Sequence, residues 1–205
     1  DRLNHNPMAN PVLWSIIAIA VFLLATGTPY PVYFSGAQFI HFLLGPAVVA
    51  MAWPLWERRA ALRRGWLRFV LAALAGGGAA ALSAAGLAWA FGMPVDVLLS
   101  LVPKSITAPV AMGVADKIGG VPALAAVFAV LTGLAGALSG KGLFALLRIG
   151  TDEVGWMARG FALGTAAHGL GAARSTQVNA TAGAYAGLAL SLQAVLASLI
   201  IPLLI

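Results

Sequence analysis

Long apolar runs joined by short polar segments are the feature that most constrains this chain. Residues 69–91, 123–147 and 182–205 are each long enough to cross a bilayer, which takes about 20 helical residues. Only 9% of the 205 residues are charged, whereas a soluble domain carries about 25%. The pattern predicts an all-α polytopic membrane protein, residues 1–205 forming a single transmembrane domain of about six to eight segments.

Charge in the polar segments predicts an orientation. Five of the twelve basic residues lie between Glu57 and Arg68, in a segment that Trp53, Trp56 and Trp66 bracket. Basic loops are retained in the cytoplasm, and tryptophans gather at the headgroup level. We therefore predict that 57–68 is a cytoplasmic loop, with the N-terminus of this chain on the same side of a cell inner membrane. The net charge of +6 gathers beside apolar runs, so it does not predict a nucleic-acid partner.

The stretch 101–110 interrupts the apolar pattern. Its polar or helix-breaking residues are Pro103, Lys104, Ser105, Thr107 and Pro109. Non-helical backbone at membrane depth is tolerated only where protein or a polar cavity surrounds it, and a lysine there costs about 2.5–3.5 kcal/mol to insert. The stretch predicts a broken or re-entrant helix that lines a substrate site. The alternative is a simple loop from which Lys104 snorkels to the surface.

Residues 160–174 form a second interrupted apolar segment. It carries the polar or helix-breaking residues Thr165, His168, Gly169, Gly171 and Arg174. Two interrupted segments in corresponding halves are the sequence sign of a transporter site built by internal repeats. The sequences that begin at Gly119 and Ala182 also run loosely in parallel. They predict an inverted repeat, unless the similarity is chance between Ala- and Gly-rich helices.

Loop charges distinguish two paths for these segments. If 95–116 crosses the membrane, the basic loop that contains Lys141, Arg148 and Arg159 falls outside, against the positive-inside rule. If 95–116 is re-entrant, that loop is cytoplasmic and 154–178 enters from the opposite side. Both paths place the C-terminus outside, and the sequence leaves the two open.

The polar groups of the two segments suit a small carboxylate. Half-helices that meet near the midplane point N–H groups and positive dipole ends at an anion. Lys104 adds a full charge, and Arg174 can clamp a carboxylate with two hydrogen bonds. The hydroxyls of Ser105, Thr107 and Thr165 can read a hydroxyl or keto group, beside Gly169.

Two of these residues have competing interpretations. His168 is the natural candidate for proton coupling, because an unperturbed histidine titrates near physiological pH, but it can also simply bond a neighbouring helix. Arg174 can equally lie in a surface turn.

No cofactor or metal motif is present: the chain lacks cysteine, HExxH, a nucleophile elbow and paired carboxylates. An enzyme is therefore the least favoured class.

Several motifs together resemble the LrgB/CidB family, whose plant relative is the plastidic glycolate/glycerate translocator. The motifs, which span nearly the whole chain, are 39–46, 101–112, 119–122, 129–133 and 159–174. The Pro-Lys-Ser pattern of the family maps to Pro103, Lys104 and Ser105, and its His-Gly pattern maps to His168 and Gly169. The family usually carries one more apolar segment before Asn10, so we expect an N-terminal segment to be missing here.

The resemblance implies one of two functions. The first is transport of small monocarboxylates such as glycolate, glycerate and pyruvate, with proton or gradient coupling. The second is antiholin-like control of murein hydrolase export and cell lysis through membrane oligomers. It also implies a small LrgA-like membrane partner and a homo-oligomer, expected to be a dimer. Ala stands at 108, 167 and 172, where the family commonly has hydroxyls, and Gly113 replaces a Glu. The identity of the substrate is therefore open.

Overall fold

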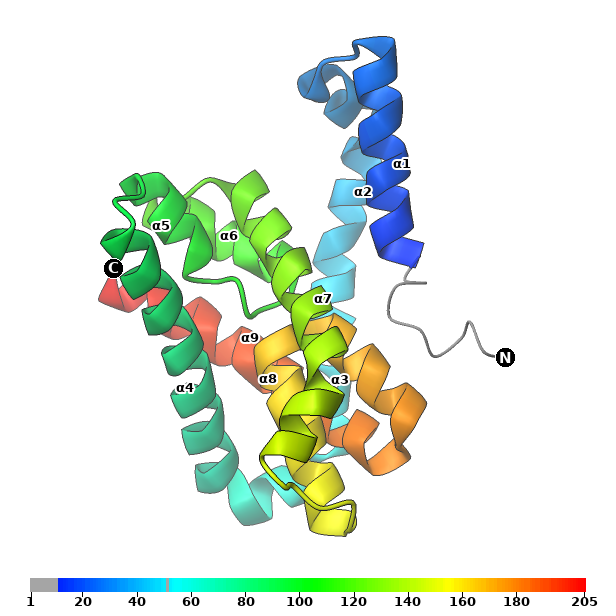
Figure 1. Ribbon diagram of the computed structural model, residues 1–205, viewed down its shortest axis with the longest axis vertical. Coiled ribbons are helices and arrows are strands. Elements are labelled where there is room, and N and C mark those ends of the chain that lie inside the picture. Colours follow the sequence, from blue (N-terminus) through cyan, green and yellow to red (C-terminus); the bar gives the residue numbers. More distant parts are fainter. Residues whose placement is uncertain (1–10, 51) are drawn as a thin grey trace. The chain divides into compact units, whose positions relative to one another are not determined.

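The computed structural model describes residues 11–50 and 52–205, and all regular structure in those ranges is helical (Figure 1). Contacts divide the chain into two compact units, residues 1–50 and 51–205. Helices α4 (Arg59–Ala90), α7 (Pro122–Leu146) and α9 (Ala180–Leu204) are long and apolar enough to cross a membrane. The prediction of an all-α polytopic membrane protein is confirmed. The predicted location of the N-terminus concerns residues 1–10, which lie outside the described ranges.

The first unit contains α1 (Pro11–Thr26) and α2 (Tyr30–Ala50). The turn between them passes through Gly27, whose φ of 62° is a conformation that glycine adopts without steric cost. Helix α2 continues through Pro46 to Ala50. A proline need not end a membrane-spanning helix, because neighbouring helices and local backbone adjustments can satisfy the carbonyl that it leaves unpaired.

The second unit holds the remaining helices. Besides α4, α7 and α9, it contains α3 (Trp53–Glu57), α5 (Val95–Leu101), α6 (Ala108–Ile118) and α8 (Glu153–Val178). Pairs of contacts give the helix directions. Phe69 on α4 packs against Phe161, with ring centroids 5.4 Å apart, and Gly76 faces Thr165, so α4 runs parallel to the first arm of α8. Gly140 of α7 faces Leu163, whereas Gly133 faces His168, so α7 is antiparallel to both.

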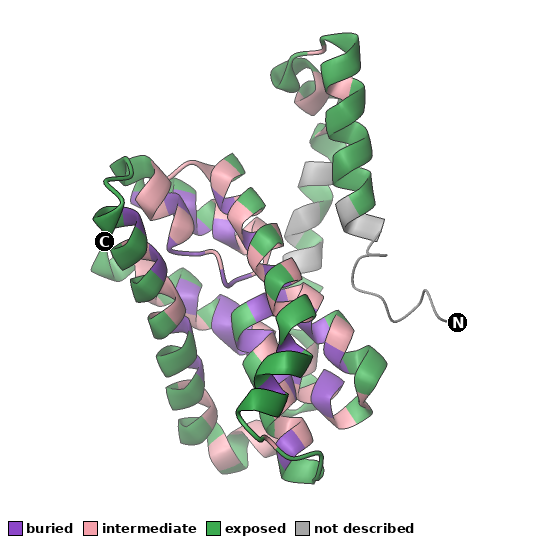
Figure 2. Cartoon of the chain, in the orientation of Figure 1, coloured by how far each residue is buried: buried purple, intermediate pink, exposed green. Residues whose placement is uncertain are grey.

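Residues 95–118 form a first hairpin, which is re-entrant. Because α4 and α7 are antiparallel, the end of α4 and the start of α7 lie at the same end of the unit. The chain between them, α5 and α6, must therefore enter and return on one side (Figure 1). Gly92 (φ 65°) and Gly119 (φ 85°) make the turns on either side of it. Its tip, residues 102–107, joins the buried core (Figure 2).

Residues 153–178 form a second hairpin within α8. The backbone of His168 is non-helical (φ 40°, ψ −131°), and the chain reverses there. Gly171 packs on the carbonyl of Leu163, a contact that eight residues of continuous helix would separate by about 12 Å. Helix α9 then runs parallel to the first arm, since Gly160 faces Ala182 and Gly164 faces Ala186. This hairpin enters at the end where α7 finishes.

The two hairpins therefore enter the unit from opposite ends, as an inverted repeat requires. The similar sequences from Gly119 and Ala182 each begin the helix that follows a hairpin, α7 and α9. The re-entrant path, rather than the simple crossing, describes both segments within this unit. The predicted helix breaks need correction. Pro109 stands in the first turn of α6, where a proline is well tolerated, and Gly171 is helical. The interruptions lie at 102–107, which includes Pro103, and at His168.

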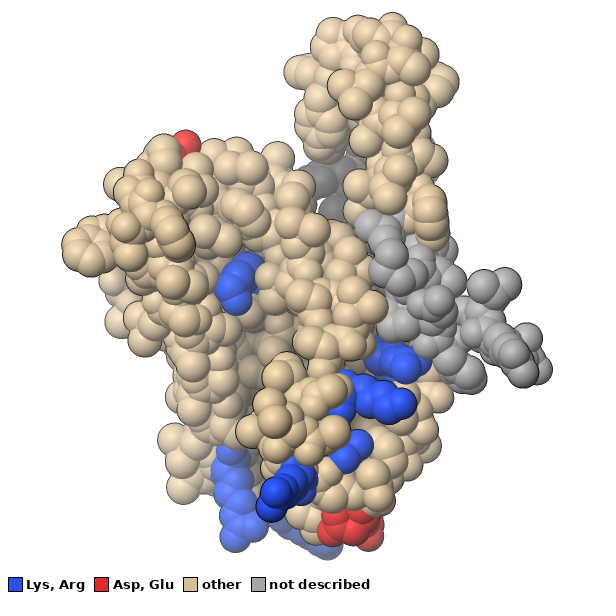
Figure 3. Space-filling view, viewed as in Figure 1, with Lys and Arg blue, Asp and Glu red and all other residues tan. Residues whose placement is uncertain are grey.

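Basic side chains gather at the end of the second unit where α4 begins and α7 finishes (Figure 3). The segment 57–68 is helical there rather than a loop, because Arg58 separates α3 from α4 and Arg59–Arg68 belongs to α4. The turn after α7 adds Arg148, and α8 adds Arg159, whose Nη2 donates to the carbonyl of Ile149. Both basic segments thus lie on one side, which the re-entrant path requires and the crossing path does not allow.

Candidate functional site

The tip of the first hairpin presents Lys104 on a tightly turned backbone. The amide of Lys104 donates to the carbonyl of Leu101, and that of Ile106 donates to the carbonyl of Pro103 (both 3.1 Å). Pro103 is fully buried and Ser105 is buried, whereas Lys104 is half-buried, with its Nζ 3.5 Å from Ser105 Oγ. The turn therefore buries its apolar part and leaves the ammonium group at the edge of the tip.

Thr107 begins the returning arm of that hairpin. It is the residue before α6, and its carbonyl accepts from the amides of Val110 and Ala111 (both 2.9 Å). The first amides of any helix have no partner within the helix and carry the positive end of its dipole. Lys104 lies only four positions before Ala108, the first residue of α6. The tip thus combines a full positive charge with a helix N-terminus, as an anion site requires.

His168 makes the reversal of the second hairpin. It is only 5% exposed, and its Nε2 lies 2.8 Å from the carbonyl oxygen of Ala129 on α7. Because a carbonyl can only accept, Nε2 carries the proton in this pair. Gly133 makes room for the ring, since a Cβ there would lie 2.8 Å from its Cε1 and Nε2. His168 thus makes the hydrogen bond to a neighbouring helix that is the structural alternative to a role in proton coupling.

The two interruptions meet on the same part of α7. Val102 and Ile106 of the first tip belong to one buried cluster with Ala125 and Ala129. Ala129 also supplies the carbonyl that holds His168. Both interrupted segments therefore pack on α7 near Ala129, and whether their polar groups form one site stays a prediction.

Thr165 lies on the inner part of the second hairpin, one turn before the reversal. Its side chain is 5% exposed, and its Oγ1 is buried with no hydrogen-bond partner. It lines a cleft of about 570 Å³ between α4 and α8. Gly169, which follows the reversal, has open space where a Cβ would stand. Among the predicted site residues, Thr165 is thus one whose buried hydroxyl makes no hydrogen bond within the described part of the chain.

Arg174 lies on the returning arm of α8, away from the reversal. Six helical residues separate it from His168, or about 9 Å along the helix. Its Nη1 lies 3.5 Å from Oε1 of the exposed Gln177. The surface interpretation of Arg174 therefore has a geometric basis, while a role in clamping a carboxylate stays a prediction.

Gln193 on α9 is a polar residue that the pattern of the sequence hides. It is 7% exposed, and its Oε1 is buried without a partner. The mean hydropathy of the run 182–205 is so high that it predicts an ordinary membrane span. A glutamine in the middle of such a run is the one sequence feature that could have indicated a buried polar position. The side chain lies over Gly77 of α4, where an added Cβ would come within 1.9 Å of Nε2.

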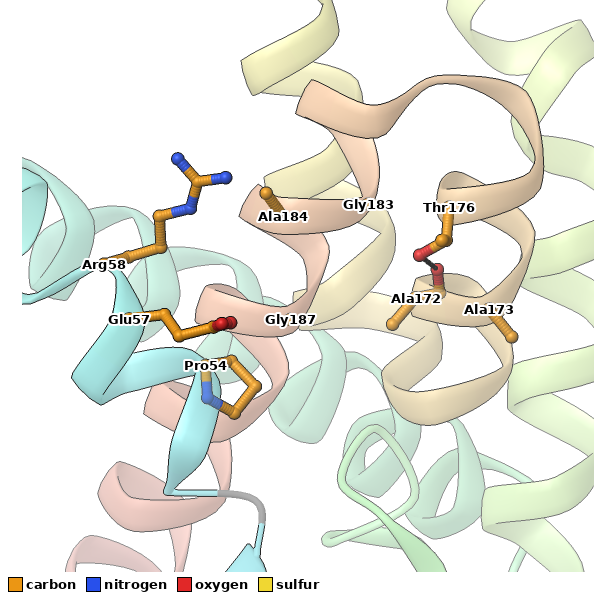
Figure 4. Close-up of a pocket in the computed structure, with 9 residues that line it drawn as sticks. All are labelled: Pro54, Glu57, Arg58, Ala172, Ala173, Thr176, Gly183, Ala184 and Gly187. Atoms are coloured by element: carbon orange, nitrogen blue, oxygen red, sulfur yellow. Dashed lines mark hydrogen bonds between the residues drawn. The ribbon is translucent and has the colours of Figure 1, made fainter.

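A second cavity lies between α3, the returning arm of α8 and the start of α9 (Figure 4). It has a volume of about 340 Å³, and Glu57, Arg58 and Thr176 are its polar residues. Thr176 is already bonded to the carbonyl of Ala172 at 3.0 Å. The remaining lining is Ala, Gly and Pro, and none of the predicted site residues reaches it.

Comparisons with known proteins match the chain over its full length. The LrgB-like family model covers residues 1–205. The uncharacterized protein YxaC of Bacillus subtilis is 35% identical over 97% of this chain and 85% of its own length. The holin-like protein CidB of Staphylococcus epidermidis is 32% identical over all of this chain and 87% of its own length. CidB of Staphylococcus aureus is also 32% identical, over 98% and 86%. No solved structure matches the chain significantly.

Proposed function

The chain belongs to the LrgB-like family, and from that premise we propose that it is a secondary transporter of small monocarboxylates of the glycolate, glycerate and pyruvate class. The two hairpins would provide alternating access. One observation carries the proposal: interrupted helices enter from opposite ends and pack on the same part of α7, around Ala129. Discontinuous helices that meet between inverted repeats are the usual setting of a transporter site.

Lys104 is proposed as the residue that binds the carboxylate. It stands at the edge of the first tip, next to Ser105 and just before the N-terminus of α6. A cation at membrane depth is expensive unless an anion or a polar cavity accompanies it. Thr107 and Thr165 would bind the other polar groups of the substrate, and Gly169 would let it approach the backbone. Arg174 is proposed to help by attracting the anion from its partly exposed position.

His168 is proposed to couple transport to protons. Because Nε2–H donates to the carbonyl of Ala129, Nδ1 would be the nitrogen of the ring that gains and loses a proton. Protonation there would put a second positive charge where the two hairpins pack. The protein would act in the inner membrane as a dimer, with the N-terminus and 57–68 in the cytoplasm and with a small LrgA-like partner. These assignments rest on the charge pattern and on the family.

Uptake into proteoliposomes tests the proposal. Labelled glycolate, glycerate and pyruvate are offered with and without an inward proton gradient, to the parent protein and to Lys104→Ala. We expect saturable, competable uptake that falls at least about tenfold in the variant, as for the loss of a charged contact. Lys117→Ala, which removes an exposed lysine from the last turn of α6, is the matched control. Uptake that Lys104→Ala leaves intact would refute the assignment of the site.

A second candidate function has more direct support from the names of the relatives. The two CidB proteins are described as holin-like, which favours a membrane protein that assembles into oligomers and regulates murein hydrolase export and lysis. Such a protein would give an unsaturable leak rather than uptake. The same proteoliposomes distinguish the two, because a leak of an uncharged dye and of carboxylates alike, insensitive to Lys104→Ala, would favour the holin-like function. Neither candidate is catalytic.

A further inference from the structure

The cleft between α4 and the first arm of α8 is apolar over most of its lining. Three of its lining residues are polar, namely Arg68, Thr165 and Tyr185, and of these only Arg68 is charged. The others are glycine, alanine and larger apolar residues, including Phe69 and Phe161, whose rings pack together. Its volume of about 570 Å³ is typical of a ligand pocket. A ligand that matches this lining has a long apolar part and one anionic group.

Arg68 lies at the depth of the lipid headgroups. The backbone of Gly65 is non-helical (φ −130°, ψ 22°), so the helix changes direction there and the membrane span of α4 begins after it. Trp66 is 57% exposed, and exposed tryptophans gather at the boundary between membrane and water. Arg68 is exposed two residues further on. The charged end of the cleft is therefore at the membrane surface, on the basic side of the unit (Figure 3).

The length of the cleft matches one leaflet of a bilayer. On α4 the lining extends from Arg68 to Gly76, eight residues or about 12 Å along the helix. On α8 it extends from Val154 to Ala166, twelve residues or about 18 Å. Half of the hydrocarbon core of a bilayer measures about 15 Å. An acyl chain whose headgroup lies at Arg68 would thus remain beside the cleft through its own leaflet.

The charges around the cleft favour an anionic headgroup. A second cation lies close by, because Cζ of Arg58 is 6.0 Å from the centre of the Tyr185 ring, and Tyr185 lines the cleft. Among the described residues, the acidic ones of the same end do not line it: Glu57, Asp152 and Glu153. Basic residues at the membrane surface attract anionic lipids, and a guanidinium group can bind a phosphate with two parallel hydrogen bonds.

We infer that this cleft binds one anionic phospholipid, with its phosphate at Arg68 and an acyl chain between α4 and the first arm of α8. The inference does not depend on the proposed transport function. The lipid would contact both a spanning helix and the second hairpin, and a ligand that binds only the folded state stabilises it. A zwitterionic phospholipid offers the same acyl chains without the net negative charge, so Arg68 should distinguish the two lipids.

Native mass spectrometry tests the site. The purified protein is titrated in detergent with phosphatidylglycerol and, separately, with phosphatidylcholine that carries the same acyl chains. We expect the first phosphatidylglycerol to bind at least about tenfold more tightly than phosphatidylcholine. Arg68→Gln should reduce that preference to below about threefold, whereas Arg68→Lys, which keeps the charge, should retain at least about half of it. Arg63→Gln removes an exposed arginine that does not line the cleft, and this matched control should change the preference less than about twofold.

A second pair of variants tests where the acyl chain lies. Ala72 and Ala75 are both exposed on α4, but only Ala72 lines the cleft. Ala72→Phe fills the cleft and should weaken the binding of both lipids at least about tenfold, whereas Ala75→Phe should leave it unchanged. Thermal unfolding gives an independent measurement: phosphatidylglycerol should raise the Tm of the parent more than phosphatidylcholine does, and Arg68→Gln should abolish the difference.

Three results would overturn the inference. Equal binding of the two lipids would show that the cleft does not recognise charge. Equal losses in Arg68→Gln and Arg63→Gln would show a diffuse attraction to the basic surface rather than a site. Lipid binding that Ala72→Phe leaves intact would place the acyl chain outside the cleft. Circular dichroism of each variant confirms that the comparison is made between folded proteins.

Discussion

The two hairpins perform the same reversal by different means. The first uses a six-residue interruption, 102–107, between short helices, and it carries a lysine at its tip. The second uses a single residue, His168, inside one long helix, and its tip is uncharged. Burial is nearly the same in the two, because nine of the 24 residues 95–118 are buried, four of them in the tip, and ten of the 26 residues 153–178.

The difference separates two tasks. The tight second hairpin is fixed by close contacts of glycines with α7 and α9, at Gly133, Gly160 and Gly164. The first hairpin exposes part of a costly charge, which a purely structural element would avoid. The comparison teaches that the second hairpin chiefly holds the centre of the unit in place, while the first presents the group that a ligand would contact.

The largest expected effect is all or none, and it tests whether the hairpins enter from opposite sides of the membrane. The chain has no cysteine, so single cysteines report on sidedness. Lys117→Cys lies on the first hairpin just before Gly119, and Thr151→Cys lies in the turn before α8; both positions are exposed. An impermeant maleimide applied to intact cells should label Lys117→Cys and spare Thr151→Cys.

Position 117 is preferable to 119, because Gly119 has a φ of 85° that cysteine would adopt only with strain. Inside-out vesicles provide the reciprocal control and should reverse the labelling. Labelling of both cysteines from the same side would contradict the opposite entry of the two hairpins.

The next effect sharpens the contrast in packing. Gly164→Ala places a Cβ 2.2 Å from the carbonyl oxygen of Ala186, so α8 and α9 must separate. We expect a loss of about 3 kcal/mol in the free energy of unfolding, as for a severe overpacking change. Gly113→Ala in α6 meets no atom within 4 Å, and it should be neutral or stabilise by up to about 1 kcal/mol.

Thermal unfolding of the two purified variants in one detergent measures the difference. Gly142→Ala on α7, also open, controls for the general effect of alanine on helix propensity. Equal destabilisation by Gly164→Ala and Gly113→Ala would show that the second hairpin is no more tightly packed than the first.

The position of the first tip and the side from which it enters can be predicted from the sequence, because a charge or a proline inside an apolar membrane segment costs free energy and is therefore conspicuous. Lys104 and Pro103 mark the first tip, and the basic residues near Arg148 count against the simple crossing by the positive-inside rule. The reversal at His168 is different. A positive φ at a residue other than glycine is enforced by tertiary contacts, here the bond to Ala129. No local pattern could distinguish His168 from Gly171 as the break.

The environments of Gln193 and Thr165 could not be predicted from the sequence, for another reason. A single glutamine scarcely changes the average of an apolar run, and its significance arises from Gly77, which is 116 residues earlier in the chain and lies under its amide. Thr165 is visible in the sequence as a hydroxyl, but that its oxygen is buried without a partner follows only from the packing of the helices.

A smaller effect tests what fixes the second reversal. His168→Ala removes the bond to Ala129 and should destabilise the protein by about 2 kcal/mol. His168→Gly also loses the bond but adopts φ 40° without strain, so it should be about 1 kcal/mol less destabilising. Ser105→Ala in the first tip loses only the long contact to Lys104 and should change stability by less than about 0.5 kcal/mol.

Denaturant titration measures the free energy of unfolding of the three variants and ranks them. Circular dichroism is the control for folding and should show the same secondary structure in all three. A Ser105→Ala effect as large as that of His168→Ala would mean that the first tip is fixed as firmly as the second. The proposed coupling role is separable in the same series, since it predicts that only the His168 variants lose the dependence of uptake on a proton gradient.

The smallest effect concerns how each hairpin is attached to the helix that follows it. In the first, Oγ of the fully buried Ser100 accepts from the amide of Val121 at 2.7 Å and donates to the carbonyl of Asp96 at 2.6 Å. In the second, Oδ1 of Asn179 accepts from the amide of Ala182 at 3.1 Å and caps α9. One polar side chain thus holds the exit of each hairpin.

Ser100→Ala should cost about 1.5 kcal/mol, because it leaves the partly buried Val121 amide without its hydrogen bond. Asn179→Ala should cost about 1 kcal/mol, the usual loss for a helix cap, and water can partly replace a cap that is only half-buried. Hydrogen exchange of the Val121 and Ala182 amides, followed by mass spectrometry, locates each effect. If Ser100→Ala accelerates exchange at the start of α7 without lowering global stability, the first hairpin can open by itself. That behaviour would suit a gating element, whereas Asn179→Ala should never produce it, because the second hairpin remains fixed along α9 by Gly160 and Gly164.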